Sequence, residues 1–331
     1  MISVIALHTI LPPVTYFSDI YTNLEVKSSI LLLNIFEIYA VPVFFMISGA
    51  LMLNPQKNIT VEKCIKKSLR IFVLLAVIGT FFALLEIIAT KRDFSIIYLV
   101  ESLFNMLADK SWAHLWYLYV LIGLYIVTPC LRKIVEYNGG GYLCIVLIIF
   151  NVLIPFFSDV ADLLLSKYGW AGIAFKIPFS GTANTYYVLG WAISNEKIRL
   201  SNKNAVLIIL GLSLYLFLAV FALKSFDGAK VLFWDINNLL GVLFSVSIFS
   251  LFYNNCQNGE DSRFQILLQE HSYGIYIVHA VFTNIAYQIL KLNPRKLNIL
   301  GMWILVFTFT FLLSFITTFI LRKIPFIKRF I

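Results

Sequence analysis

Long apolar runs, most of them about as long as a bilayer is thick, follow one another along the chain. A helix rises 1.5 Å per residue, so about 20 apolar residues cross a hydrocarbon core about 30 Å thick. Hydrophobic residues make up 60% of the 331 positions and charged residues only 13%, against about 25% charged residues in soluble domains. A soluble chain of this composition would lack the polar surface that keeps a protein in solution. The sequence therefore predicts an all-α integral membrane protein.

The runs predict a polytopic helical bundle of about ten transmembrane helices. No linker is long or polar enough to divide the chain, so we expect a single transmembrane domain over residues 1–331. The short segment 94–108 is apolar on one side and favours an interfacial helix. The sixth span is polar and holds two glycines, which is typical of a helix that lines a cavity. The ten expected spans are approximately 1–17, 29–53, 70–90, 112–131, 140–165, 178–194, 204–223, 236–254, 271–290 and 298–321.

Basic residues give the expected orientation. With the N-terminus in the cytoplasm and ten crossings, both termini are cytoplasmic and fifteen of the 26 Lys and Arg residues fall in inner loops. Such an excess is expected on the cytoplasmic side of a membrane protein. We interpret the net charge of +9 as an orientation signal and a match to anionic membrane lipids, not as a nucleic-acid surface.

The sequence lacks the motifs of metal sites and of phosphate-binding loops. The four cysteines, at positions 64, 130, 144 and 256, show neither CxxC nor Cys/His spacing, so we expect no metal site. No glycine-rich phosphate loop of the GxGxxG or GxxxxGK[ST] type is present, which argues against an ATP-driven pump.

Ionisable residues inside the expected spans are few, and such residues usually face a cavity or a functional path. His8 lies seven residues into the first span and is either a buried structural histidine or a general base. Glu37 and Glu86 are either protonated structural groups or cavity carboxylates. His114 and His279 fall near span ends, where His114 is an interfacial residue or a catalyst and His279 a structural residue or a catalyst; we favour the first interpretation of each.

Five fragments, in this order along the chain, resemble the acyltransferase 3 family of bacterial integral membrane enzymes that modify surface glycans. They are His8 in the first span, VPVFFMISGALM (41–52), KKSLR (66–70), HLWYLYVLIGLYIVTP (114–129) and SYGIYIVHA (272–280). The expected number of spans also agrees with that family. The resemblance implies an O-acyltransferase of the bacterial inner (plasma) membrane. It would move an acyl group, often acetyl from acetyl-CoA, to a hydroxyl of a cell-surface or lipid-linked saccharide.

The resemblance also implies roles for particular residues. His8 would act as the general base on the acceptor hydroxyl or relay the acyl group. Ser48 would help to form the cavity that receives the substrate. The phosphates of acyl-CoA would bind to Lys63, Lys66, Lys67 and Arg70, and the saccharide would stack on Trp112, Trp116 and Tyr117. The partners are thus a saccharide acceptor and membrane lipids.

Two departures from the family pattern stand out. The pattern carries an Arg upstream of the first-span His, and this chain begins too late to include it, so we expect a first helix truncated at its N-terminus. The basic motif usually has two Arg three residues apart, whereas here Lys67 and Arg70 keep that spacing. Lys lacks the planar fork with which Arg binds phosphate.

Two alternatives from other classes remain. An exporter of polysaccharide or lipid-linked sugar would also use a polar sixth span and glycine-interrupted helices. A non-catalytic membrane sensor would fit if the upstream Arg is truly absent.

Overall fold

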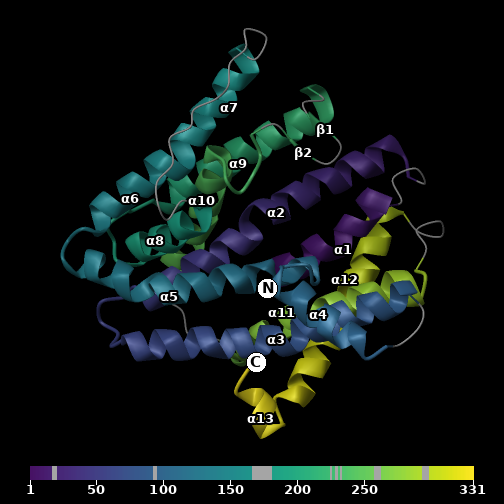
Figure 1. Cartoon of the computed structure of the whole chain (residues 1–331). Helices are drawn as coiled ribbons and strands as arrows, with labels where there is room; N and C mark the ends of the chain where they lie inside the picture. Colours follow the sequence, from purple (N-terminus) through teal and green to yellow (C-terminus); the bar gives the residue numbers. More distant parts are fainter. Residues whose placement is uncertain are drawn as a thin grey trace. The chain divides into compact units, whose positions relative to one another are not determined.

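The computed structural model describes residues 1–16, 21–91, 95–165, 181–223, 226–227, 230–231, 233–256, 262–292 and 298–331. Over these residues the ordered elements are helices apart from one short hairpin, in which β1 (Phe226–Asp227) pairs antiparallel with β2 (Lys230–Val231). Contacts divide the chain into two compact units. Figure 1 labels the helices and strands of both. The predicted all-α class is confirmed, and the single-domain organisation stays a prediction.

The first unit comprises residues 1–54, 138–323 and 331. Its elements are α1 (Ile2–Tyr16), α2 (Asn23–Met52), α6 (Gly140–Ile148), η3 (Ile149–Leu153), α7 (Ile154–Leu165), α8 (Thr182–Ser194), α9 (Asn202–Leu218), η5 (Ala219–Leu223), the hairpin, α10 (Leu239–Cys256), α11 (Arg263–Asn284), η6 (Ile285–Ile289) and α12 (Ile299–Leu321). The second unit comprises residues 55–137 and 324–330, with α3 (Val61–Lys91), α4 (Ile97–Leu107), η2 (Ala113–Leu115), α5 (Trp116–Glu136) and α13 (Pro325–Lys328).

Among the described residues, seven helices or helix runs are long and apolar enough to cross a membrane. They are α2, α3, η2–α5, α6–α7, α9–η5, α10 and α12. Their outward faces carry large apolar side chains that the rest of the chain leaves exposed, such as Val77, Leu207 and Ile304. The protein is therefore a multi-pass membrane protein.

The other three expected spans fall on α1, α8 and the run α11–η6. The count of ten crossings stays a prediction, and residues 178–180 of the sixth expected span lie outside the described residues. The expected interfacial segment coincides with α4, an apolar helix too short to span, although residue 94 is not described.

Polar side chains cap several helices of the first unit and so fix where they begin. Thr22 and Glu25 form a reciprocal capping box at the start of α2, and Ser262 and Gln265 form another at the start of α11. The Asn298 side chain accepts a hydrogen bond from the backbone N–H of Gly301 at 2.7 Å and so caps α12.

Two glycines bring α2 and α8 into close contact. A Cβ at Gly49 would collide with the backbone carbonyl of Tyr187, and one at Gly190 would collide with that of Met46. The backbones approach this closely only because glycine has no side chain. Neighbouring helices consequently bury α8 along most of its length.

The expectation that the sixth span lines a cavity stays a prediction. The described residues of α8 are absent from the lining of the cavity of the first unit given below, which is formed by other segments. Polar side chains of α8 instead bond to neighbouring segments. Thr185 Oγ1 accepts a hydrogen bond from Asn151 Nδ2 at 3.1 Å, and Tyr186 Oη donates to the carbonyl of Ile236 at 2.7 Å. Part of the polarity of this span therefore serves hydrogen bonds to neighbouring segments.

In the second unit, α3 packs against α4 and α5. The buried face of α3 repeats at intervals of three and four residues through Cys64, Ser68, Ile71 and Leu75. Ser68 Oγ donates to the carbonyl of Ile122 on α5 at 3.3 Å, which ties the polar start of α3 to its neighbour.

Candidate active site

Two histidines from distant parts of the sequence meet in the first unit. The rings of His8 on α1 and His279 on α11 lie with their centroids 5.2 Å apart and their planes tilted by 46°. His279 is completely buried, whereas His8 keeps part of its surface exposed. We call these two residues the histidine pair.

A backbone carbonyl fixes the tautomer of His279. The Nδ1 atom of His279 lies 2.6 Å from the carbonyl oxygen of Tyr276, three residues earlier on α11. A carbonyl oxygen only accepts hydrogen bonds, so Nδ1 must carry the proton. In the neutral ring, Nε2 is then the basic nitrogen.

Hydrogen bonds on either side of His8 hold α1 in place. Trp303 Nε1 donates to the carbonyl of Ala6 at 3.1 Å, and Tyr287 Oη donates to the carbonyl of Thr9 at 2.7 Å. The donors belong to α12 and η6, so α1 is fixed to two other elements at the level of His8. Such support keeps a reactive side chain in one position.

The geometry of the histidine pair suits proton transfer. An imidazole can accept a proton from a hydroxyl and return it to a leaving group near neutral pH. The ring of His279 lies beside that of His8 and helps to hold it in position.

The structure does not bring Ser48 to the histidine pair. The helices α1 and α2 run antiparallel, and Ser3 Oγ lies 3.0 Å from Tyr39 Oη. His8 lies five residues after Ser3 on α1, and Ser48 lies nine residues after Tyr39 on α2. Because the two helices are antiparallel, these steps lead in opposite directions. At 1.5 Å per residue, His8 and Ser48 are about 20 Å apart along the helices.

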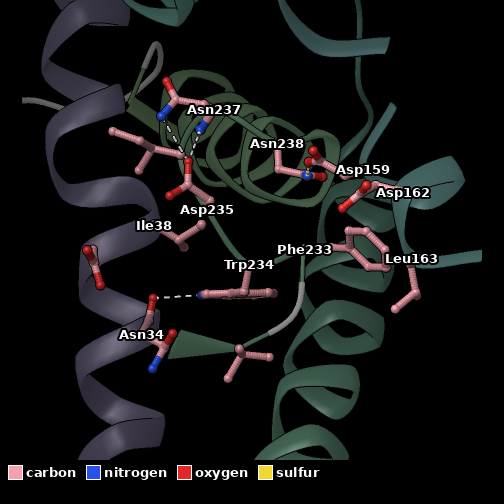
Figure 2. Close-up of a pocket in the computed structure, with 13 residues that line it drawn as sticks. Asn34, Ile38, Asp159, Asp162, Leu163, Phe233, Trp234, Asp235, Asn237 and Asn238 are labelled. Atoms are coloured by element: carbon pink, nitrogen blue, oxygen red, sulfur yellow. Dashed lines mark hydrogen bonds between the residues drawn. The ribbon is translucent and has the colours of Figure 1, made fainter. Parts of the chain in front are cut away.

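The first unit also contains a cavity of about 440 Å³. It is formed by α2, the end of α7 and the segment that connects β2 to α10 (Figure 2). Four carboxylates line it, and the Lys, Arg and His residues that the structure describes are absent from its lining; we call it the acidic cavity. Its lining residues are Asn34, Glu37, Ile38, Asp159, Asp162, Leu163, Val231, Phe233, Trp234, Asp235, Ile236, Asn237 and Asn238.

Hydrogen bonds between segments shape the acidic cavity, as Figure 2 shows. Trp234 Nε1 donates to the carbonyl of Asn34 on α2 at 2.9 Å, which places the indole across the gap between the two segments. Asn238 Nδ2 donates to Asp159 Oδ2 on α7 at 3.0 Å. A third bond, from the backbone N–H of Asn237 to Asp235 Oδ1 at 2.7 Å, keeps the connecting segment folded.

The two membrane glutamates differ in their surroundings. Glu37 lines the acidic cavity, so of its two expected interpretations the structure favours the cavity carboxylate. Glu86 lies on the exposed surface of α3. Among the described residues, no group of three or more His, Cys, Asp or Glu side chains is arranged to hold a metal ion.

The four basic residues expected to bind the donor gather on one side of α3 in the second unit. Lys63, Lys66, Lys67 and Arg70 are spaced at i, i+3, i+4 and i+7, which places them on one helix face, and all four are exposed. We call this surface the basic face. Helix formation alone brings these charges together, whereas their role in donor binding stays a prediction.

Some members of the basic face already have partners. Lys66 Nζ lies 2.6 Å from a carboxylate oxygen of Glu62, and both side chains are largely exposed. Lys63 Nζ donates to the carbonyl of Asn58 at 2.7 Å. Lys67 lies over the ring of Tyr125, 5.7 Å from its centroid.

The aromatic residues expected to bind sugar are also in the second unit. Trp112 stacks on Phe82 with centroids 4.3 Å apart, so one of its faces is covered. Tyr117 is buried and Trp116 is partly buried. His114 is buried beside the same phenyl ring, which fits a structural role. The proposed stacking of sugar on these residues stays a prediction.

Sequence reasoning missed two features of the first unit. It favoured a structural role for His279, although the residue lies within the fragment SYGIYIVHA that carries part of the family resemblance. It also passed over Asp159, Asp162 and Asp235, which fall near span ends and resemble ordinary loop charges. The intramembrane Glu37 was the one signal that pointed to the acidic cavity.

Comparison with known proteins bears on the resemblance. No curated protein and no solved structure matches the chain. The family model described as the acyltransferase domain of the acyltransferase 3 family matches residues 1–323, nearly the whole chain. The predicted family, membrane class and enzyme class are thereby confirmed. The chain belongs to the acyltransferase 3 family and is a membrane acyltransferase that transfers groups other than aminoacyl groups.

Proposed function

We propose that this acyltransferase moves an acyl group, acetyl in the first instance, from acyl-CoA to a hydroxyl of a cell-surface or lipid-linked saccharide. The proposal places it in the plasma membrane of a bacterium, with both termini in the cytoplasm. Family membership supports acyl transfer, and the histidine pair is the observation that supports a hydroxyl acceptor.

In the proposed reaction, His8 accepts the proton of the acceptor hydroxyl as its oxygen attacks the carbonyl carbon of the thioester. The C–O bond forms, the C–S bond breaks, and the proton passes to the departing CoA thiolate. No oxidant or reductant is needed. His279 lies beside His8 with its own tautomer fixed, and it serves to hold the His8 ring in its orientation.

The basic face is the proposed binding surface for the phosphates of acyl-CoA. Arg70 can bind a phosphate through two parallel hydrogen bonds, whereas the three Lys residues act as point charges. In the expected orientation this start of α3 faces the cytoplasm, where acyl-CoA is made available. The acidic lining of the cavity in the first unit would repel the same phosphates, so the donor does not enter there.

Purified full-length protein with acetyl-CoA tests the enzyme directly. Release of free CoA should require a saccharide acceptor, and the acceptor should gain the mass of one base-labile acetyl ester. A panel of soluble and lipid-linked glycans is needed, with a His8→Ala protein at equal concentration as the control.

Gene deletion in the producing cell tests the role of the enzyme there. The surface glycan should remain in roughly the same amount and lose one ester-linked acyl group. Loss of glycan export with unchanged esters on the remaining glycan would contradict the proposal and favour the exporter alternative.

A further inference from the structure

The acidic cavity is lined by groups that accept hydrogen bonds and carry negative charge. Glu37, Asp159, Asp162 and Asp235 approach it from α2, α7 and the segment before α10. All four of these residues are exposed, and no cation among the described residues lines the cavity, so the lining attracts positively charged molecules. A ligand that supplies both hydrogen-bond donors and positive charge fits best.

Asn238 offers an independent sign of a missing donor. Its side chain is buried, and Figure 2 shows it directed toward the carboxylate of Asp159 on the facing helix. That carboxylate accepts the hydrogen bond from Nδ2, so the amide orientation is fixed and the other amide atom is Oδ1. Oδ1 is buried without a hydrogen-bond partner in the structure. Buried acceptors are nearly always satisfied, which indicates that a donor binds here.

The walls and size of the acidic cavity suit a sugar ring. Trp234 and Phe233 contribute aromatic surface, and apolar faces of sugars pack on such rings. The volume of about 440 Å³ lies within the range of small-molecule sites, about 300–1,000 Å³. Phe233 has φ of 59°, a left-handed conformation that is unfavourable for a bulky residue and that recurs at ligand-binding segments.

We infer that the acidic cavity binds a saccharide unit carrying a free amino group, as its protonated ammonium, and that this unit belongs to the acyl acceptor. The ammonium donates three hydrogen bonds to the carboxylates and to Asn238 Oδ1, while the ring hydroxyls and apolar face use the remaining wall. The acceptor role rests on the proposed function, whereas binding of the ammonium sugar does not.

The cavity and the histidine pair share one packed core. Ile10, two residues after His8, belongs to the same hydrophobic cluster as Ile38 and Trp234, which line the cavity. The cavity wall therefore packs on the same hydrophobic cluster as α1.

Binding to the purified full-length protein in lipid nanodiscs tests the inference. The probes are a glucosamine tetramer with free amines and its fully N-acetylated counterpart, which has equal length and no charge. By calorimetry, the amine form should bind at least about tenfold more tightly, a difference of about 1.4 kcal/mol. The preference should shrink as salt rises, since the attraction is electrostatic.

Two variants locate the site. Asp159→Asn with Asp162→Asn should weaken binding of the amine form about tenfold or more and leave the N-acetylated form unchanged. Asp162→Asn alone keeps the hydrogen bond between Asp159 and Asn238. This single variant replaces the double variant in the binding measurement if the double variant fails to fold. Glu101→Gln with Glu196→Gln removes two charges from exposed positions outside the cavity and should have no effect.

Equal affinities for the two tetramers, or unchanged binding of the amine form to the cavity variants, would overturn the inference. Binding without transfer, in a protein that acylates another saccharide, would overturn the acceptor role alone. Failure to acylate any saccharide would instead contradict the proposed function, and the calorimetric comparison of the two tetramers would still decide the cavity's ligand.

Discussion

The histidine pair in the first unit and the basic face in the second are assembled in opposite ways. His8 and His279 come from helices at the two ends of the sequence and meet in a largely buried position. The basic face lies within three turns of the single helix α3 and is exposed. The histidine pair depends on the packing of several helices, whereas the basic face depends only on the formation of α3.

This difference sets the size of the effect that each region should have on activity. Buried polar groups interact strongly because little water screens them, so loss of one member has a large effect. Exposed charges are screened over about 8–10 Å at ordinary salt, and neighbours partly substitute for one another. Changes to the histidine pair should therefore be large and independent of salt, whereas changes to the basic face should be graded and sensitive to salt.

The largest effect is expected for His8→Ala. Removal of the general base should lower the rate of acyl transfer by about 10²–10⁴-fold, while membrane insertion is unchanged because a polar residue leaves the span. Glycan acylation is measured in cells that carry equal amounts of wild-type or variant protein.

The matched control for His8 is His271→Ala, which removes a buried imidazole from α11 that lies against Phe315 and Phe319. This control should retain far more activity than His8→Ala. Equal acylation by His8→Ala and wild type would rule out His8 as the base.

A smaller effect is expected for His279→Asn. The Asn amide can still donate to the carbonyl of Tyr276, but the second imidazole is lost. We expect kcat to fall about tenfold to a hundredfold with KM for acyl-CoA nearly unchanged, since the proton transfer is impaired and donor binding is not.

The pH profile distinguishes this role of His279 from a purely structural one. The acidic limb of the kcat profile reports the group that must be unprotonated for the reaction, which is His8 in the proposed mechanism. In His279→Asn the ring beside His8 is lost, so the surroundings of His8 change and the limb should move to a new pH. A fall in kcat with an unshifted limb would assign His279 to packing alone.

The helices and the basic face were predictable because both depend on local sequence. Apolar runs of sufficient length predict helices in lipid, and the spacing of Lys63 to Arg70 places the four charges on one face of any such helix. The contact between His279 and His8 could not be predicted in this way, because it depends on how α1 packs against α11.

The polar contacts of the first unit were missed for the same reason. Asp159 and Asp235 fall near the ends of expected spans, where charges are common, and only the folded chain places them around one cavity. The polarity of α8 predicted a cavity-lining helix that does not face lipid, but not its hydrogen-bond partners, Asn151 and Ile236, which lie far from α8 in the sequence. Tyr117 likewise proved to be buried, because aromatic side chains pack wherever neighbours offer apolar surface.

The smallest and most graded effects are expected on the basic face. Lys67→Gln with Arg70→Gln should raise KM for acyl-CoA about three- to tenfold at low salt, and the difference from wild type should shrink at high salt. Lys63→Gln with Lys66→Gln removes the same amount of charge but should raise KM for acyl-CoA less. The reason is that these two side chains already bond to Asn58 and Glu62.

The two double variants therefore serve as controls for each other. Both alter the charge that orients the protein, so cysteine-accessibility mapping must first show that the N-terminus and the loop before α3 keep their sides of the membrane. If both variants raise KM equally, the basic face acts through its total charge and no residue is preferred. If neither changes KM in a correctly oriented protein, the charges serve orientation alone and the donor binds elsewhere. A large loss of kcat that persists at high salt would show that the basic face contributes to catalysis itself, and the contrast with the histidine pair would fail.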